Sequence, residues 1–366
     1  MPTLLVTGGA GFIGSNFVLH WRRTRPRDRI VVLDALTYAG NLANLKPLAE
    51  DPAMQFVHGD ICDEQLVGEL FRRHGFDTVV HFAAESHVDR SIVSSKAFIR
   101  TNVQGTHTLL DAALQAWKSS IESRRFHHIS TDEVYGSLEP HDNPFVEITR
   151  YDPKSPYAAS KAASDFLVRS YAHTYGLPVT ITNCSNNYGP YQFPEKLVPL
   201  VVLNALMGKS LPIYGDGLNV RDWLYVEDHC AALALVLDKG RLGETYNIGG
   251  GQEVPNVELV KMLCAEIDRR FAGDNSLAAR FPKCPAVAQR SCRELMTFVE
   301  DRPGHDRRYA ICADKLSHEL GFRAQTSLAD GIAKTVDWYI ANEQWWRPIQ
   351  SGAYRDWIKL QYGATN

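Results

Sequence analysis

The stretch VTGGAGFIG, residues 6–14, decides the fold. Gly8, Gly11 and Gly14 form G-x-x-G-x-x-G, while Gly9 and the last two form G-x-G-x-x-G, and both spacings end a strand and open a helix. Glycine lets the backbone turn tightly and approach a pyrophosphate, whose charge then meets free N–H groups at the helix N-terminus. A glycine-rich turn can also be purely structural, so the residues around it have to decide.

Short β-branched runs alternate with longer amphipathic stretches from the start to about residue 190. This β-α-β rhythm predicts an α/β fold with a parallel doubly wound sheet, a Rossmann domain over residues 1–190. Residues 191–366 are less regular and predict a smaller C-terminal α/β lobe, with some chain crossing back after residue 215. Residues 271–293 read as a surface insertion. The strand candidates are residues 3–9, 29–36, 55–60, 78–84, 125–131 and 179–185.

Composition narrows the class of protein. The chain has 366 residues, 45% of them hydrophobic, and a formal net charge of −3 with no long run of Lys or Arg, which argues against nucleic acid or membrane partners. No apolar run approaches the roughly 20 residues of a membrane span. Glycines follow only five residues of strand, which leaves no room for a signal peptide. The seven cysteines form no C-x-x-C pair, so we expect reduced thiols, a cytoplasmic location and no metal.

Asp34 lies twenty residues past Gly14 and ends the second strand candidate, RIVVLD. An acid at this position can accept hydrogen bonds from both hydroxyls of an adenosine ribose. No Arg or Lys directly follows it to bind a 2′-phosphate, so the sequence favours NAD over NADP. A helix cap or a solvated loop acid is the alternative. Spacing and position together favour the ribose contact.

Two further strand ends point to the same edge of the sheet. Asp60 and Ile61 follow the third strand candidate, where they could contact adenine. The segment FAAES, residues 82–86, follows the fourth with small side chains that suit the close approach of a ribose and nicotinamide. An ordinary turn at residues 60 and 61, or plain packing at residues 82–86, would give the same sequence pattern.

Tyr157 and Lys161 in YAASK are four residues apart and so share one face of a helix that begins near Pro156. A tyrosine phenol has a reference pKa near 10, so it needs a nearby cation to act as a base at neutral pH, and Lys161 can supply that charge. Thr131 ends the fifth strand candidate 26 residues earlier, where its hydroxyl can bind a substrate oxygen. Taken alone, the Tyr/Lys pair is more often an amphipathic surface pair.

The glycine turn, the ribose acid, the strand-end hydroxyl and the Tyr/Lys pair occur in the order of the extended short-chain dehydrogenase/reductase family, which the chain resembles over nearly all its length. Within it, five segments are similar to the dTDP-glucose 4,6-dehydratases. The resemblance implies NAD bound by residues 1–190 and dTDP-glucose bound mainly by residues 191–366. The segments are STDEVYG (130–136), YAASKAASD (157–165), NNYGPYQFPEKL (186–197), RDWLYVEDH (221–229) and EDRPGHDRRYAI (300–311).

The reaction implied by the resemblance has three steps on the glucose: oxidation at C4, loss of water across C5 and C6, and reduction at C6, which regenerates NAD. Tyr157 is then the base for the C4 hydroxyl, Glu133 the base at C5, and Asp132 the acid for the departing C6 hydroxyl. Asp132 and Glu133 therefore need well-separated pKa values. Side chains alternate on a regular strand, so we predict an irregular turn after Thr131.

The resemblance also implies two contact sets. Arg221 and Arg302 suit a diphosphate, although a lone Arg is usually a surface ion pair. His127 and His128 lack metal-like spacing and are interpreted as structural or supporting. The cofactor set is Gly8, Gly11, Phe12, Ile13, Gly14, Asp34, Ala35, Leu36, Thr37, Asp60, Ile61, Phe82, Ala83, Ala84, Glu85, Ser86, Thr101, Tyr157, Lys161 and Asn187. The substrate set is Ser86, Thr131, Asp132, Glu133, Asn186, Lys196, Leu197, Pro212, Ile213, Tyr214, Arg221, Asn256, Asp301, Arg302, Pro303, Gly304 and His305.

Several alternatives stay open. A nucleotide-sugar 4-epimerase shares the fold, NAD, Thr131, Tyr157 and Lys161, but does not need Asp132 and Glu133. A non-catalytic NAD sensor would not need the Tyr/Lys pair. UDP-, CDP- and GDP-sugars remain possible substrates. A homodimer formed through helices is implied by resemblance, and the apolar periodicity of residues 97–117 and 157–175 permits it, though core packing explains that pattern equally well.

Overall fold

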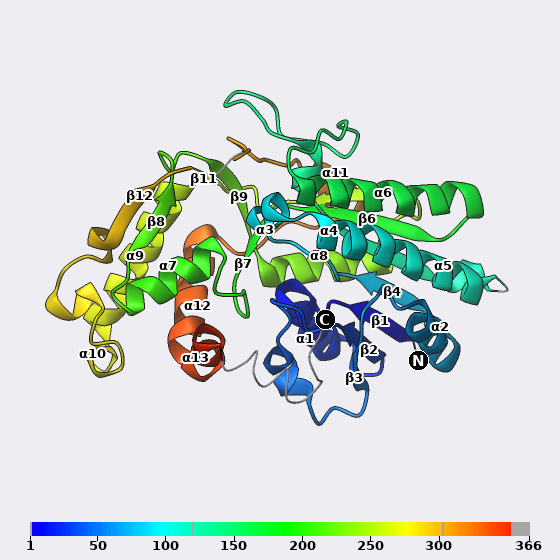
Figure 1. Cartoon of the computed structure of the whole chain (residues 1–366), viewed down its shortest axis with the longest axis horizontal. Helices are drawn as coiled ribbons and strands as arrows, with labels where there is room; N and C mark the ends of the chain where they lie inside the picture. The colour runs from blue at the N-terminus through cyan, green and yellow to red at the C-terminus, as the bar shows by residue number, and fades with distance from the viewer. Residues whose placement is uncertain (1, 119, 302–303, 353–366) are drawn as a thin grey trace.

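A parallel sheet of seven strands forms the centre of the chain in this computed structural model, which describes residues 2–118, 120–301 and 304–352 (Figure 1). Its order, β10-β6-β5-β4-β1-β2-β3, is that of a doubly wound sheet and confirms the predicted α/β class. All six strand candidates are strands. The strands are β1 (Thr3–Thr7), β2 (Arg29–Asp34), β3 (Met54–His58), β4 (Thr78–His81), β5 (Arg125–Thr131), β6 (Val179–Cys184) and β10 (Thr245–Ile248).

Helices cover both faces of the sheet, as parallel strands buried on both sides require. On one face, Phe17 of α1 and Leu233 of α8 pack against Val6 and Val32. On the other, Leu109 of α5 and Val168 of α6 pack against Val79. The first face has α1 (Phe12–Thr24), α8 (Val226–Lys239) and α11 (Asp314–Leu320). The second has α2 (Glu64–His74), α5 (Thr106–Trp117) and α6 (Pro156–Tyr175).

Short helical segments fill the connections of this part of the chain. A π-helix, η2, runs directly into α5, and a 3-10 helix, η4, follows β5. The short segments are η1 (Leu42–Leu48), α3 (Val88–Val93), α4 (Lys96–Phe98), η2 (Ile99–Gly105), η3 (Ile121–Ser123) and η4 (Asp132–Tyr135).

The second lobe has its own small sheets and its own core. Figure 1 shows α7, α9, α10 and β8 on the side of the molecule away from α2 and α5. Strands β11, β9 and β7 form one sheet, and β12 pairs in parallel with β8. The elements are β7 (Asn186–Tyr188), α7 (Leu197–Leu206), β8 (Leu211–Tyr214), β9 (Val220–Tyr225), β11 (Glu253–Pro255), α9 (Asn256–Gly273), α10 (Leu277–Arg280), η5 (Pro285–Ala288), η6 (Cys292–Leu295), β12 (Met296–Val299), α12 (Leu328–Ala341) and α13 (Glu343–Ser351).

The chain passes between the two parts more than once. Helix α8 and strand β10 come after residue 215 and belong to the large sheet, where β10 pairs with β6. The division at residue 190 stays a prediction.

Residues 271–293 lie mostly at the surface, as the sequence led us to expect, but a few of their side chains are buried in the core of the second lobe. Leu277, Phe281, Cys284 and Cys292 are buried in one apolar cluster with α7, α9 and α12. The Cys284 and Cys292 sulfurs lie 3.6 Å apart. Sequence reasoning missed this because single apolar residues among prolines, glycines and charges carry no helical or strand period.

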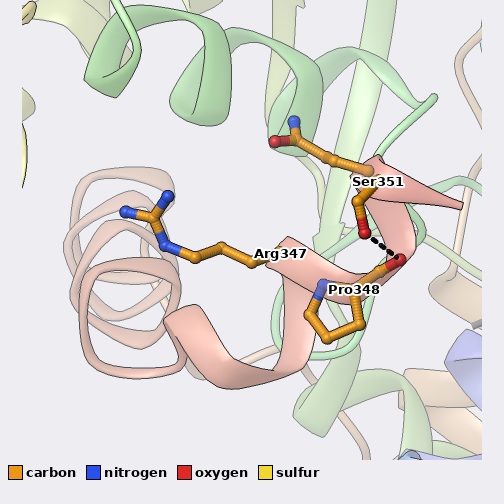
Figure 2. A pocket seen from close by; sticks show the side chains of 4 residues that line it. Arg347, Pro348 and Ser351 are labelled. Atoms are coloured by element: carbon orange, nitrogen blue, oxygen red, sulfur yellow. Dashed lines mark hydrogen bonds between the residues drawn. The ribbon is translucent and has the colours of Figure 1, made fainter. Parts of the chain in front are cut away.

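An open hollow lies beside the end of α13, lined by Arg347, Pro348, Gln350 and Ser351 (Figure 2). The Ser351 hydroxyl donates to the Pro348 carbonyl at its rim, 3.1 Å away. None of the predicted site residues lines it, so the chemistry has to be sought at the carboxyl ends of the strands. None of the described helices combines the length and apolarity needed to cross a membrane.

Candidate active site

The glycine turn between β1 and α1 leaves no room for a side chain at Gly8 or Gly14. Gly8 has φ +69°, and a Cβ there would lie 2.6 Å from the Ala83 nitrogen. A Cβ on Gly14 would lie 2.3 Å from the Gly8 carbonyl oxygen. Gly11 is the N-cap of α1 and offers no side-chain cap, which leaves the first turn, including Phe12 and Ile13, able to present N–H groups to an anion.

Asp34 joins the glycine turn to the loop after β2. Its carboxylate accepts hydrogen bonds from the Ala10 nitrogen (2.9 Å) and the Leu36 nitrogen (2.8 Å). Burial raises the pKa of Asp34 above its usual range, while these two N–H groups act against the shift. Each oxygen keeps a second lone pair for a ribose hydroxyl. The glycine turn lets a ligand approach the backbone closely, and Asp34 can accept from a ribose, so this arrangement fits a dinucleotide.

The remaining predicted cofactor positions surround that turn on adjoining loops. Ala35 and Thr37 flank Leu36, which has an unusual φ of +49°. Asp60 accepts from the Cys62 nitrogen and lies 2.8 Å from Arg100, so part of its charge is already matched by protein. Ile61 is buried beneath η2. Phe82, Ala83, Ala84, Glu85 and Ser86 follow β4, and Thr101 lies in η2.

Asn102, in the π-helix η2, was missed by the sequence reasoning. Its side-chain oxygen accepts from the Glu85 nitrogen (2.8 Å), and its amide donates to the Glu85 carbonyl (3.0 Å) and to the Ser160 hydroxyl (2.8 Å). It thereby holds the loop after β4 against the helix that carries Tyr157. π-Helices often occur at functional sites, but this one gives no signal in sequence periodicity.

The irregular turn predicted after Thr131 is present as η4, a 3-10 helix over Asp132–Tyr135. The Thr131 hydroxyl accepts from the Glu133 nitrogen and donates to the Asp132 carboxylate, both at 3.3 Å. Thr131 is thus the N-cap of this turn. The helical path frees Asp132 and Glu133 from the alternation of a strand.

Burial and a neighbouring negative charge favour the protonated forms of both Asp132 and Tyr157. Burial, then the neighbouring Glu133, raises the pKa of Asp132 well above its usual range, and Arg221 acts against this. Burial and then Glu133 also raise the pKa of Tyr157, with Asp132 a smaller contributor and a hydrogen bond with Thr131 acting the other way. Both carboxylates therefore lie near the same phenol. This meets the condition that Asp132 be protonated while it works as an acid.

Helix α6 positions Tyr157 and Lys161. It begins as the sequence predicts, with Pro156 in the first turn and the Ser155 hydroxyl accepting from the Ala158 nitrogen at 3.1 Å. The Lys161 ammonium donates to the Ile129 carbonyl (2.7 Å) and lies 3.4 Å from His128 Nε2. Burial lowers the pKa of Lys161, and Asp165 is the first cause that opposes it.

Predicted substrate residues carry hydrogen-bonding groups that the described protein leaves unmatched. Asp132 Oδ2, Asn186 Oδ1 and Asn256 Oδ1 are buried and have no hydrogen-bond partner within the described part of the chain. These three oxygens can accept hydrogen bonds from a polar ligand without displacing a protein partner. Lys196 donates to the Ser86 carbonyl (3.2 Å) just before α7, whose first residue is Leu197.

Arg221 lies on β9 and is buried. Its guanidinium donates to the Val220 (2.7 Å) and Asp306 (3.0 Å) carbonyls and stacks over Tyr309. It is also close enough to Asp132 to lower the pKa of that acid. The diphosphate-binding position predicted from the sequence thus adjoins the predicted acid.

The outer part of the predicted substrate set lies on β8 and the segment after β12. Pro212, Ile213 and Tyr214 form the end of β8, with Tyr214 packed edge-on against His305. His305 Nδ1 lies 2.6 Å from Asp301, and Gly304 has φ +64°. Arg302 and Pro303 lie outside the described residues.

Asn187 makes protein contacts where a cofactor-side contact was expected. Its amide donates to the Ser185 carbonyl, and its oxygen faces His229 Nδ1, both at 2.9 Å. Its predicted role stays a prediction. Over the described ranges, no group of three or more His, Cys, Asp or Glu side chains is placed to hold a metal ion.

A family model described as GDP-mannose 4,6 dehydratase matches residues 5–335. The chain belongs to that family. A dTDP-glucose 4,6-dehydratase of Shigella flexneri is 52% identical over 98% of both chains, and one of Xanthomonas campestris pv. campestris is 54% identical over 97% of this chain and 98% of its own. The resemblance seen in the sequence is confirmed.

Solved structures agree with these relatives. DesIV of Streptomyces venezuelae, a dTDP-glucose 4,6-dehydratase crystallised with NAD and TYD bound, superimposes with a TM-score of 0.83 at 50% identity, covering 95% of this chain and 99% of its own. The UDP-glucose 4-epimerase of Thermotoga maritima shares the fold with a TM-score of 0.78, but only 27% identity, over 93% and 99% of the two chains. Dehydratases and epimerases share this fold, so the side chains at the active site have to distinguish the two activities.

Proposed function

We propose that this chain is a dTDP-glucose 4,6-dehydratase, a hydro-lyase that converts dTDP-glucose to dTDP-4-keto-6-deoxyglucose and water and serves deoxysugar biosynthesis. The observation that carries the proposal is the pair Asp132 and Glu133 on η4, beside Thr131 and Tyr157. Elimination of water needs an acid and a base in addition to the groups that oxidise C4. The 52% identity to curated dTDP-glucose 4,6-dehydratases supports the same substrate.

NAD is the cofactor: when bound, it accepts a hydride from C4 and later returns it to C6. The glycine turn and Asp34 hold its pyrophosphate and adenosine ribose. Tyr157 removes the C4 hydroxyl proton, Thr131 binds the same oxygen, and Lys161 supplies positive charge. Glu133 then takes the C5 proton, which the 4-ketone has acidified, while Asp132 protonates the C6 hydroxyl so that it leaves as water. C5 regains a proton when the hydride returns to C6.

The substrate's nucleotide part is assigned to the second lobe and to the residues around it. Arg221 binds the diphosphate, and Asn186, Lys196 and Asn256 form further hydrogen bonds to the nucleotide sugar. A 4-epimerase would use Tyr157 and Lys161 equally well. It would have no use for a buried acid whose pKa is raised, as that of Asp132 is.

The decisive experiment is incubation of the enzyme with dTDP-glucose in D2O without added cofactor. We expect a 4-keto-6-deoxy product that carries deuterium at C5, with no net formation of NADH. Recovery of dTDP-galactose, or NADH formed in proportion to substrate, would contradict the dehydratase assignment. UDP-, CDP- and GDP-glucose tested in parallel should turn over more slowly, and equal rates would contradict the assignment of the nucleotide.

We propose that the protein works as a cytoplasmic homodimer that pairs through α6. The outward stripe of α6 is apolar or small, and Phe166 in it is 56% exposed. The seven free cysteines are compatible with a reducing compartment. Light scattering should give a mass of twice 41.0 kDa for the native chain and a shift toward 41.0 kDa for Phe166→Glu. A native mass of one chain would refute the dimer.

A further inference from the structure

The carboxylate of Asp165 is buried on the side of α6 that packs on β5. No step of the reaction has been assigned to it. Asp165 is one helical turn past Lys161 and is 0% exposed. An acid this deeply buried is rare unless it is paired, because taking an isolated carboxylate out of water is expensive. Its surroundings therefore indicate what the charge is for.

Two hydroxyl groups donate to Asp165, and an imidazole lies beside it. Its Oδ2 accepts from the Ser130 hydroxyl (2.7 Å) and from the Tyr151 hydroxyl (2.9 Å), and its Oδ1 lies 3.1 Å from His128 Nε2. The Tyr151 hydroxyl is in turn held by Arg169 at 2.8 Å. Although burial is the largest single influence and acts the other way, the pKa of Asp165 stays below its usual range because His128, Lys161 and Ser130 together favour the carboxylate.

His128 lies next to both this carboxylate and Lys161. The same Nε2 atom lies 3.4 Å from the Lys161 ammonium, and the imidazole is 0% exposed. Burial, followed by Lys161, lowers the pKa of His128 to about 4, so the ring is neutral at working pH. Its Nδ1 has no hydrogen-bond partner in the described part of the chain. The Asp165 carboxylate and the Lys161 ammonium therefore lie next to the same uncharged ring nitrogen.

The other groups that bear on Lys161 are neutral. Burial raises the pKa of the Cys184 thiol to about 12, and burial lowers the pKa of His81 well below its usual range. Among the groups that act on Lys161, Asp165 thus supplies the negative charge.

We propose that Asp165 is a positioning residue for the oxidation step: its buried negative charge, which lies close to Lys161 at the same His128 nitrogen, keeps the Lys161 ammonium protonated beside β5. This inference rests on the proposed function, since it assigns Lys161 the task of making Tyr157 a base. Without a buried anion, an ammonium in this apolar setting loses its proton at a lower pH. Tyr157 would then lack its cation.

The test compares Asp165→Asn with Tyr151→Phe. Asn has the shape of Asp but no charge, whereas Tyr151→Phe removes one hydrogen bond from the same carboxylate oxygen and keeps the charge. The rate of C4 oxidation is measured against pH in a single turnover. In Asp165→Asn the alkaline limb should move to lower pH by about one unit or more. In Tyr151→Phe it should stay in place.

A merely structural role predicts lower rates in both variants with the alkaline limb unmoved, and that result would overturn the inference. A second readout needs neither substrate nor a stable Asp165→Asn. Nitrogen-15 NMR of the wild-type imidazoles, with His128 assigned from His128→Gln, should show a neutral ring from pH 5.5 to 9. A charged His128 ring would refute the inference, because Asp165 would then be paired with His128 and not with Lys161. Failure of the wild type to make the 4-keto product would instead refute the proposed function.

Discussion

Replacing Asp132 by Asn should make the folded protein more stable near neutral pH while it stops the elimination of water. Asp132 is 2% exposed, and its Oδ2 has no hydrogen-bond partner among the described residues. Burial and Glu133 raise its folded pKa well above the ordinary value of 3.8. A neutral amide of the same shape removes the penalty of ionisation without opening a cavity.

The sign of the stability difference follows from the difference between the folded and unfolded pKa of Asp132. Below pH 3.8 Asp132 is protonated in the folded and the unfolded chain, so the native acid and the amide differ little. Above that pH the unfolded chain ionises while the folded site does not. Native stability then falls relative to Asp132→Asn by ~1.4 kcal/mol for each pH unit until the folded pKa is reached. Loss of a general acid should slow elimination by about 10²–10⁴-fold and leave oxidation at C4 nearly unchanged.

The assay is urea unfolding of the protein and the variant at several values between pH 4 and pH 8. Asp165→Asn is the matched control, because Asp165 is equally buried but accepts from the Ser130 (2.7 Å) and Tyr151 (2.9 Å) hydroxyls, and its pKa lies below the usual range. That variant should lose stability at every pH, since an amide nitrogen cannot accept those bonds. A stability difference for Asp132→Asn that stays constant with pH would refute the reasoning.

Three more predictions follow from the site and the core. Glu133→Gln should lower deuterium incorporation at C5 by about 10²–10⁴-fold while C4 oxidation continues, and an equal loss of both would contradict separate roles. Gly14→Ala should weaken NAD binding in calorimetry by roughly tenfold or more, ~1.4 kcal/mol, because its Cβ would lie 2.3 Å from the Gly8 carbonyl oxygen; unchanged affinity would count against this. Phe281→Ala should lower the free energy of unfolding by ~3–5 kcal/mol. Phe298 is 58% exposed, so Phe298→Ala should lower it by less than ~0.5 kcal/mol, and similar losses in the two variants would contradict core packing around Phe281.

The parts of the protein that local sequence dictates were predictable. The six N-terminal strands are short β-branched runs, and the glycine turn needs residues without side chains, so both are visible in the sequence. The turn after Thr131 followed from a chemical requirement, because two adjacent acids cannot both face one sugar from a regular strand.

What escaped prediction depends on contacts between distant segments. Asn102 reaches Ser160 across 58 residues, and nothing near either residue indicates the bond. Cys284 and Cys292 meet only because their segment folds onto α9. His128 was interpreted as structural or supporting because it lacks metal-like spacing, and its position between Asp165 and Lys161 required coordinates.

The two halves of the proposed reaction make opposite demands on one buried site. Burial and Glu133 favour the protonated forms of both Asp132 and Tyr157, which suits the acid but hinders the base. A cation is therefore needed that acts on Tyr157 and not on Asp132, and Lys161, held against β5, lies on the Tyr157 helix. Arg221 lowers the pKa of Asp132. A substrate diphosphate that neutralises Arg221 removes this influence, so binding of the nucleotide itself would help to keep Asp132 protonated for elimination.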